Sequence, residues 1–124
     1  MPRILVIDDN AAIRELLRLV LEEEGYEVIE AADGAEGLQR YQATPTDLVI
    51  TDLKMPGMDG LELLMALRRV VPTPALMAIS GDRDALTQAK GLTPHTFAKP
   101  LPLEQVLAAV RNLDLRHRSY DETA

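Results

Sequence analysis

The sequence contains no cysteine and is short of cations. The absence of cysteine excludes disulfide bonds, thiolate metal sites and cysteine nucleophiles, so any chemistry must use carboxylates, hydroxyls, lysine or histidine. The 13 lysines and arginines are outnumbered by 20 aspartates and glutamates, which gives a net charge of -7. Because binding to nucleic acid depends on clustered cations, direct contact of this chain with DNA or RNA is disfavoured.

Long apolar runs are also missing. The apolar stretch 4–7 near the amino end is far too short for a secretion signal, and no later stretch approaches the length of a membrane span. We therefore predict no membrane insertion and a cytoplasmic location. With 124 residues, of which 47% are hydrophobic and 27% charged, the chain has the size and composition of one folded globular domain.

Two kinds of apolar pattern alternate along the chain. Short runs rich in valine and isoleucine, such as 4–7, are typical of strands buried on both faces of a parallel sheet. Longer segments place apolar residues three and four positions apart, which indicates amphipathic helices, and Asn10 is available to cap the first of them. The predicted strands are 4–7, 27–31, 47–51, 75–79 and 96–98, and the predicted helices are 13 to about 25, 35–42, 61–71, 82–90 and 103–113.

This alternation predicts an α/β fold, a doubly wound five-stranded parallel sheet with helices on both faces. In such folds the ligand crevice lies outside the carboxyl ends of the strands. Asp8 and Asp9 follow the first predicted strand, Asp52 the third, Ser80 the fourth and Lys99 the fifth. We therefore expect these side chains to meet at one edge of the sheet.

The carboxylates of Asp8, Asp9 and Asp52 would repel one another unless a divalent cation lies among them. Ligation by oxygen alone favours Mg²⁺, with Mn²⁺ as the alternative, over Zn²⁺. Such a site keeps positions open for water or phosphate oxygens, which suits phosphoryl transfer. Asp52 is then the natural nucleophile, and the Lys99 ammonium and the Ser80 hydroxyl are placed to meet the charge on the phosphoryl oxygens.

The same residues resemble the motifs of a known family, the receiver domain of bacterial two-component response regulators. The motifs are Asp8-Asp9, the segment TDLKMPGMDG over 51–60, Ser80-Gly81 and Lys99-Pro100. The resemblance predicts a receiver domain over 1–113, with the flavodoxin-like strand order 2-1-3-4-5, and a polar tail over 114–124 that we expect to fray. No output domain follows within these 124 residues. The chain is therefore either a stand-alone regulator similar to single-domain chemotaxis regulators or a part of a longer chain, and the unpatterned tail favours the first.

The resemblance also implies roles in phosphorylation. Asp52 would accept a phosphoryl group from a sensor histidine kinase or a phosphotransfer protein, in a reaction that depends on Mg²⁺. Asp9 would bind the metal directly and Asp8 through water, and Lys54 would offer its backbone carbonyl to the metal. Hydrolysis of the phosphate would reset the switch.

Further positions receive roles from the same resemblance. Ser80 and Lys99 would both reach the phosphoryl group, and the bond from Lys99 to Pro100 would be cis. Pro56 and Gly57 fit a tight turn, in which proline fixes φ and glycine supplies a positive φ, so they would shape the crevice rather than react.

The segment 80–99 departs from the family pattern. Thr96 stands three residues before Lys99, where receivers often carry an aromatic, and we predict a switch role for Thr96. The segment is also a few residues shorter than is usual, which leaves about two turns for the fourth helix. Phosphorylation is expected to shift the region 80–103 and so change the affinity for a downstream protein target, with a phosphorylation-dependent dimer as a further expectation.

Two charged residues flank the predicted pocket. Lys54 lies two residues beyond Asp52, and Asp82 lies two residues beyond Ser80. We predict that Lys54 and Asp82 face each other across the mouth of the pocket and influence how water reaches the phosphate.

Other functions fit parts of the pattern. A Mg²⁺-dependent phosphohydrolase would carry Asp-x-Asp at the first strand, whereas residues 8–10 read Asp-Asp-Asn, and no inserted segment could enclose a substrate. A dinucleotide-binding domain would need glycines in place of this acidic pair. An interaction module that does not use phosphate stays open, although its usual sign would be the loss of Asp52 or Lys99. We expect no enzymatic activity beyond self-phosphorylation and self-dephosphorylation.

Overall fold

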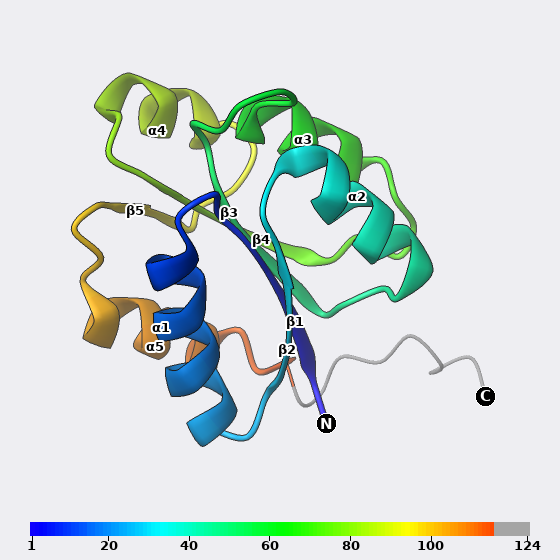
Figure 1. Cartoon of the computed structure of the whole chain (residues 1–124), viewed down its shortest axis with the longest axis vertical. Helices are drawn as coiled ribbons and strands as arrows, with labels where there is room; N and C mark the ends of the chain where they lie inside the picture. The colour runs from blue at the N-terminus through cyan, green and yellow to red at the C-terminus, as the bar shows by residue number, and fades with distance from the viewer. Residues whose placement is uncertain (116–124) are drawn as a thin grey trace.

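The strands form one parallel sheet in the order β2-β1-β3-β4-β5, and the helices connect them (Figure 1). This computed structural model describes residues 1–115. The order of the strands confirms the predicted α/β fold with the strand order 2-1-3-4-5. The strands are β1 (Arg3–Ile7), β2 (Glu27–Ala31), β3 (Leu48–Asp52), β4 (Ala75–Ser80) and β5 (Thr96–Ala98). The helices are α1 (Ala11–Glu23), α2 (Gly34–Ala43), α3 (Gly60–Arg68), α4 (Arg83–Ala89) and α5 (Leu103–Asn112).

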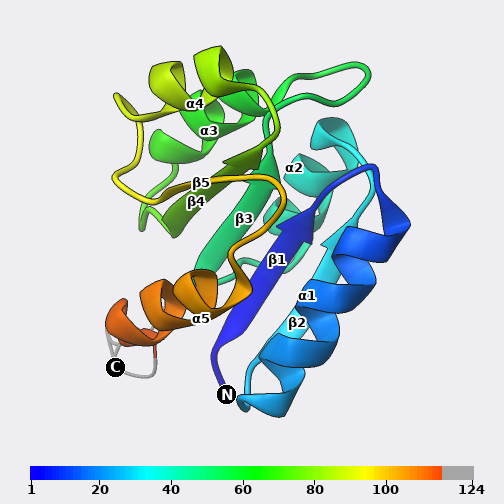
Figure 2. The same cartoon turned by 90° about the vertical axis from the view of Figure 1, so that its left-hand side faces the viewer.

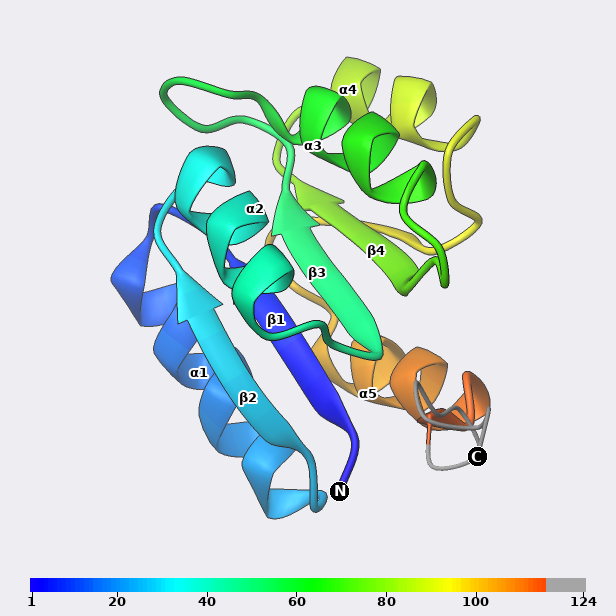
Figure 3. The ribbon, with the colours of Figure 1, turned by 90° about the vertical axis from the view of Figure 1, so that its right-hand side faces the viewer.

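Helices cover both faces of the sheet. Helices α1 and α5 lie on one face, seen in Figure 2, and α2, α3 and α4 lie on the other, seen in Figure 3. Successive residues of β1 point to opposite faces, so that Val6 packs in the cluster under α1 and α5, whereas Ile7 packs in the cluster under the other three helices. Burial on both faces explains why this strand is a continuous apolar run rather than an alternating one.

Short polar side chains begin most of the helices. Asn10 accepts hydrogen bonds from the backbone N–H groups of Ala12 and Ile13, as its position before α1 predicts. Asp33, Asp59 and Asp82 cap α2, α3 and α4 in the same way. The four caps stand in the loops that follow the carboxyl ends of β1, β2, β3 and β4, so the loops at this edge of the sheet are tied to the starts of helices.

Helix α3 is shorter than predicted. It ends at Arg68 rather than at residue 71, and Val71 is 90% exposed instead of lying on the apolar face of the helix. The physical reason is Pro72, because a proline disfavours helical conformation in the residue before it. Helix α4 has the short length that the sequence predicts. Within residues 1–115, no helix has both the length and the apolar character that crossing a bilayer requires.

The packed part of the chain continues past the predicted boundary at residue 113. Leu115 is 1% exposed and belongs to the cluster under α1 and α5. The remainder of the predicted tail, 116–124, lies outside the described residues.

Candidate functional site

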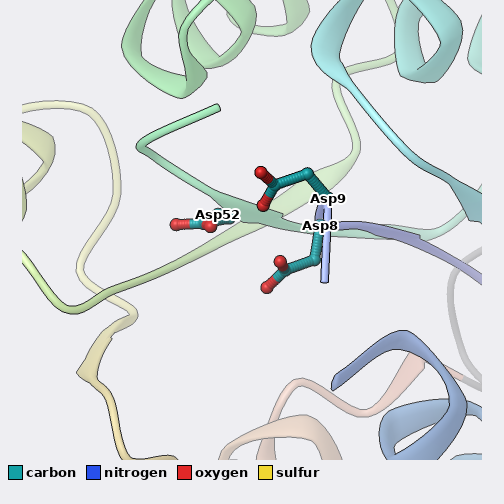
Figure 4. Close-up of side chains that lie close together, drawn as sticks. All are labelled: Asp8, Asp9 and Asp52. Carbon is teal, nitrogen blue, oxygen red and sulfur yellow. The ribbon is translucent and has the colours of Figure 1, made fainter. Parts of the chain in front are cut away.

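Three carboxylates meet at the carboxyl edge of the sheet. Asp8 and Asp9 follow β1, and Asp52 is the last residue of β3, the strand next to β1 in the sheet. One carboxylate oxygen from each residue lies within 4.8 Å of the other two, and Figure 4 shows the three side chains gathered in one space. Asp8 and Asp52 are buried and Asp9 is exposed. The predicted convergence of these carboxylates is confirmed.

Lys99 contacts the acidic cluster, the group formed by Asp8, Asp9 and Asp52. Its Nζ lies 2.8 Å from Asp8 Oδ2 and 3.2 Å from Asp52 Oδ2. Burial alone would lower the pKa of the Lys99 ammonium, but the contacts with Asp8 and Asp52 outweigh it and raise the pKa above its ordinary value. Burial raises the pKa of the Asp8 carboxyl, despite the opposing hydrogen bonds from Lys99 and from the Asn10 N–H. At this edge one ammonium thus faces the carboxylates of three aspartates.

The backbone holds Asp52 from several sides. Its Oδ1 accepts a hydrogen bond from the Lys54 N–H at 3.3 Å, and its carbonyl oxygen accepts one from the Thr51 hydroxyl at 2.8 Å. Helix α3 also approaches closely, because a Cβ at Gly60 would meet the Asp52 carbonyl oxygen at 2.3 Å. Only glycine permits this approach, which fixes the loop after Asp52 against the start of α3.

Ser80 ends β4, the strand on the other side of β3. It is fully buried, and its hydroxyl oxygen accepts a hydrogen bond from the Asp82 N–H at 3.0 Å. The helix cap at this point is Asp82 rather than Ser80, since the Asp82 side chain accepts from the Ala85 N–H. A Cβ at Gly81 would meet nothing within 4 Å, so the space beside Gly81, next to Ser80 in the chain, is open.

Lys54 and Asp82 form an ion pair between the loops that follow β3 and β4. Lys54 Nζ lies 3.4 Å from Asp82 Oδ2, and the two side chains are 65% and 38% exposed. The hydrogen bond from the Ala85 N–H, followed by the charge of Lys54, lowers the pKa of Asp82. The predicted facing arrangement of these two residues is confirmed.

The turn residues have the predicted conformations. Gly57 has a φ of 81°, a left-handed value that favours glycine after Pro56. The Lys99–Pro100 bond is cis, as the family resemblance implies. Cis geometry at Val71–Pro72 was not predicted.

Thr96 and Phe97 lie on opposite faces of β5. Phe97 pairs with Ile79 in the sheet and packs in the cluster under α1 and α5. Thr96 pairs with Ala78, whose side chain belongs to the cluster on the other face. The aromatic ring of Phe97 therefore cannot take the place that the sequence assigns to Thr96, and the switch role of Thr96 stays a prediction.

Arg14 contacts the site although the sequence did not single it out. Its Nη1 donates a hydrogen bond to the backbone carbonyl oxygen of Asp8 at 2.6 Å. Its position could have indicated this contact. Arg14 lies four residues after the Asn10 cap, and side chains on a helix point back toward its amino end, here toward the end of β1.

The donor set suits a hard divalent cation. Asp8, Asp9 and Asp52 offer only carboxylate oxygens, which Mg²⁺ and Mn²⁺ prefer, and the exposed Asp9 keeps the cluster open to solvent. The acidic cluster thus has the composition of a Mg²⁺ site of the kind used in phosphoryl transfer.

Comparison with known proteins gives a consistent result. A model described as the response regulator receiver domain matches residues 4–111, which include every strand-end residue of the site. The chain is 36% identical to sporulation initiation phosphotransferase F of Bacillus subtilis (strain 168), over 88% of this chain and 90% of that protein. It is also 36% identical to transcriptional regulatory protein ResD of the same organism, over 90% of this chain but 47% of that protein. The chain thus spans about half the length of the transcriptional regulatory protein ResD.

Solved structures agree with the sequence relatives. Response regulator protein TrrA from Thermotoga maritima, in complex with Mg²⁺ and BeF, is 32% identical with a TM-score of 0.84, over 91% of this chain and 99% of that chain. Chemotaxis response regulator CheY4 of Vibrio cholerae is 28% identical with a TM-score of 0.82, over 90% of this chain and 98% of that chain.

Proposed function

Because this chain belongs to the response regulator receiver domains, we propose that Asp52 accepts the phosphoryl group of a phosphorylation-activated switch, in a reaction that depends on Mg²⁺. Receiver domains take this group from histidine kinases or phosphotransfer proteins. The observation that carries the proposal is the arrangement at the carboxyl edge. There, Lys99 Nζ contacts Asp52 at 3.2 Å and Asp8 at 2.8 Å, and the carboxylate of Asp9 lies beside them.

The phosphoryl transfer is a displacement at phosphorus. A carboxylate oxygen of Asp52 forms a bond to phosphorus while the bond between phosphorus and the donor atom breaks, and the donor keeps that electron pair. Lys99 supplies positive charge and N–H donors to the phosphoryl oxygens, and the Ser80 hydroxyl supplies another donor from the neighbouring strand. Dephosphorylation ends the signal. A water oxygen forms a bond to phosphorus while the bond between phosphorus and the Asp52 oxygen breaks, so that inorganic phosphate leaves and Asp52 keeps the electron pair as its carboxylate.

The proposed Mg²⁺ site shares Asp52 with the phosphoacceptor site and adds ligands from its neighbours. Asp9 and Asp52 would bind Mg²⁺ with carboxylate oxygens, Asp8 would bind it through water, and Lys54 would bind it with its backbone carbonyl. When bound, Mg²⁺ neutralises negative charge on the phosphoryl oxygens. The chain catalyses only its own phosphorylation and dephosphorylation. Phosphorylation changes its affinity for a partner protein through the side of the fold that carries Ser80 and Lys99.

Mg²⁺ is expected to stabilise the folded chain, because it binds carboxylates that repel one another without it. At about 100 times its dissociation constant, the free energy of unfolding should rise by about 2.7 kcal/mol. Asp9→Asn should abolish most of this rise, while its metal-free form should be at least as stable as the metal-free wild type, since one of the repelling charges is gone. Thermal unfolding with and without Mg²⁺ measures both effects.

Glu23→Gln provides the charge-matched control, because Glu23 is an exposed residue at the far end of α1. This variant should keep the stabilisation by Mg²⁺. An equal Mg²⁺ effect in wild type and in Asp9→Asn would remove Asp9 from the proposed ligand set.

The Lys54–Asp82 ion pair is expected to limit the access of water to the phosphate. Lys54→Met and Asp82→Asn should each accelerate dephosphorylation by roughly two- to fivefold, a modest effect because both side chains are partly exposed to solvent. Asparagine at position 82 keeps an acceptor for the Ala85 N–H, so the cap of α4 is retained. The decay of the phosphorylated chain, followed by intact mass after removal of the donor, gives the rate.

Two comparisons make this test specific. The double variant should dephosphorylate no faster than the faster single variant, because either change already breaks the pair. Asp84→Asn, an exposed change in the first turn of α4, should have no effect. Unchanged rates in both single variants would refute the role of the pair.

A further inference from the structure

Arg14 connects helix α1 to β2 and to the residue that follows β1, beside the acidic cluster. Its Nη1 donates to the Asp8 carbonyl oxygen at 2.6 Å, and its Nε donates to Glu30 Oε1 of β2 at 3.2 Å. The Arg14 side chain is 19% exposed, so the guanidinium is largely enclosed between these partners. A planar guanidinium with several fixed donors can serve both acceptors at once.

The carbonyl that Arg14 contacts belongs to the peptide group between Asp8 and Asp9. Because a peptide group is planar, holding its oxygen also fixes the plane of the Asp9 nitrogen. Asp8 is held from other directions as well, since its N–H donates to Ala31 O at 3.2 Å and its Oδ1 accepts from the Asn10 N–H at 2.9 Å. The Asp9 side chain is exposed, so its direction depends more on this backbone than on packing around it.

We propose that Arg14 is a positioning residue of the metal site. Its hydrogen bond to the Asp8 carbonyl holds the peptide group that directs the Asp9 carboxylate toward those of Asp8 and Asp52. Figure 4 shows the three carboxylates in this arrangement. The inference rests on the proposed function, in which Asp9 is a metal ligand. Contacts that orient metal ligands from outside contribute about tenfold or more to metal affinity in other proteins.

The charge of Arg14 has the opposite effect on metal binding. A cation beside an acidic site repels Mg²⁺, so the loss of its charge alone would strengthen metal binding. The loss of an orienting hydrogen bond would weaken it. The direction of the change in affinity therefore separates positioning from simple electrostatics.

Arg18 is a matched control on the same helix. Its Nε contacts Glu30 Oε2 at 2.9 Å, and its Nη1 contacts Glu22 Oε1 at 3.4 Å, one turn further along α1. Arg14 and Arg18 thus share the Glu30 carboxylate, but the bond to the Asp8 carbonyl comes from Arg14. Replacing either by methionine removes one charge and one contact with Glu30 while keeping an apolar stem.

The test is the affinity of the full chain for Mn²⁺, measured by the loss of the electron paramagnetic resonance signal of free Mn²⁺ and checked by competition with Mg²⁺. Arg14→Met should bind Mn²⁺ roughly tenfold more weakly than wild type, whereas Arg18→Met should bind within about twofold of wild type. In phosphorylation by acetyl phosphate, Arg14→Met should need more Mg²⁺ for half-maximal rate and reach a nearly normal rate at saturation. A variant that is merely misfolded would instead lose rate at saturating Mg²⁺ as well.

Each other outcome contradicts a specific statement. Unchanged or tighter Mn²⁺ binding by Arg14→Met would overturn the positioning role, as would an equal loss in Arg18→Met. If Arg14→Met does not fold, Arg14→Lys should bind Mn²⁺ roughly threefold more weakly than Arg18→Lys, because lysine keeps the charge but has a single donor nitrogen for two acceptors. Equal affinities would overturn the role. Failure of the wild type itself to bind Mn²⁺ would instead overturn the proposed function.

Discussion

Asp52→Asn is expected to abolish phosphorylation of the chain by acetyl phosphate. Asparagine has nearly the same shape as aspartate, so it can keep the contact with the Lys54 N–H through its amide oxygen. It lacks the anionic oxygen that attacks phosphorus, however, and cannot form the acyl phosphate. Intact mass spectrometry in the presence of Mg²⁺ should show one phosphate adduct on the wild type and none on the variant.

Asp47→Asn is the matched control for this result. Asp47 is a buried carboxylate just before β3, at the opposite end of the strand from Asp52, where it accepts a hydrogen bond from the Arg3 N–H at 2.8 Å. This variant should be phosphorylated like the wild type. A normal adduct on Asp52→Asn would show that another residue is the acceptor, whereas a folded wild type without any adduct would favour an interaction module that does not use phosphate.

Lys99→Met is expected to slow phosphorylation by roughly 10²- to 10³-fold at saturating Mg²⁺. The ammonium lies 3.2 Å from Asp52 Oδ2, so it is placed to stabilise charge that develops on the transferred group. Lys90→Met, an exposed change at the end of α4, should leave the rate unchanged. A Lys99→Met rate within about threefold of wild type would contradict the assigned role, since the loss of an important donor at a developing charge has a larger effect.

The same variant should change how stability depends on pH. The contacts with Asp8 and Asp52 raise the pKa of Lys99 in the folded chain. Their stabilisation is therefore complete below the ordinary lysine pKa of about 10.4 and is lost as the pH rises through the higher folded value. Metal-free wild type should show this alkaline loss in urea unfolding, and Lys99→Met should show less of it and be less stable at neutral pH, because Asp8 is left buried without its cation.

The sequence predicted the site well because the carboxyl ends of parallel strands lie at the same edge of the sheet. Once the strands were recognised from apolar runs such as 4–7, the residues after them had to meet at one edge, and Asp52 and Lys99 do so. Capping by Asn10 was predictable for a similar local reason, since it depends on the two backbone N–H groups that follow it.

Features that depend on the orientation of a helix, on where it ends or on the register of a strand were harder to predict. Arg14 acts through a backbone carbonyl six residues earlier, which requires the angle at which α1 leaves β1. The end of α3 was misplaced because the apolar spacing that reaches Val71 outweighed the effect of Pro72. The inward direction of Phe97 toward α1 and α5 follows from the register of β5 with β4, where a shift by one residue would reverse the two faces.

The most direct test of the central claim is a crystal structure of the chain with Mg²⁺ and beryllofluoride, which mimics a phosphoryl group on aspartate. The structure should show beryllium bonded to a carboxylate oxygen of Asp52, fluorine atoms within hydrogen-bond distance of Lys99 Nζ and the Ser80 hydroxyl, and Mg²⁺ against Asp9, Asp52 and the Lys54 carbonyl. Beryllofluoride on another residue, or bound at Asp52 with Mg²⁺ elsewhere, would contradict the claim that these residues form one phosphoacceptor site.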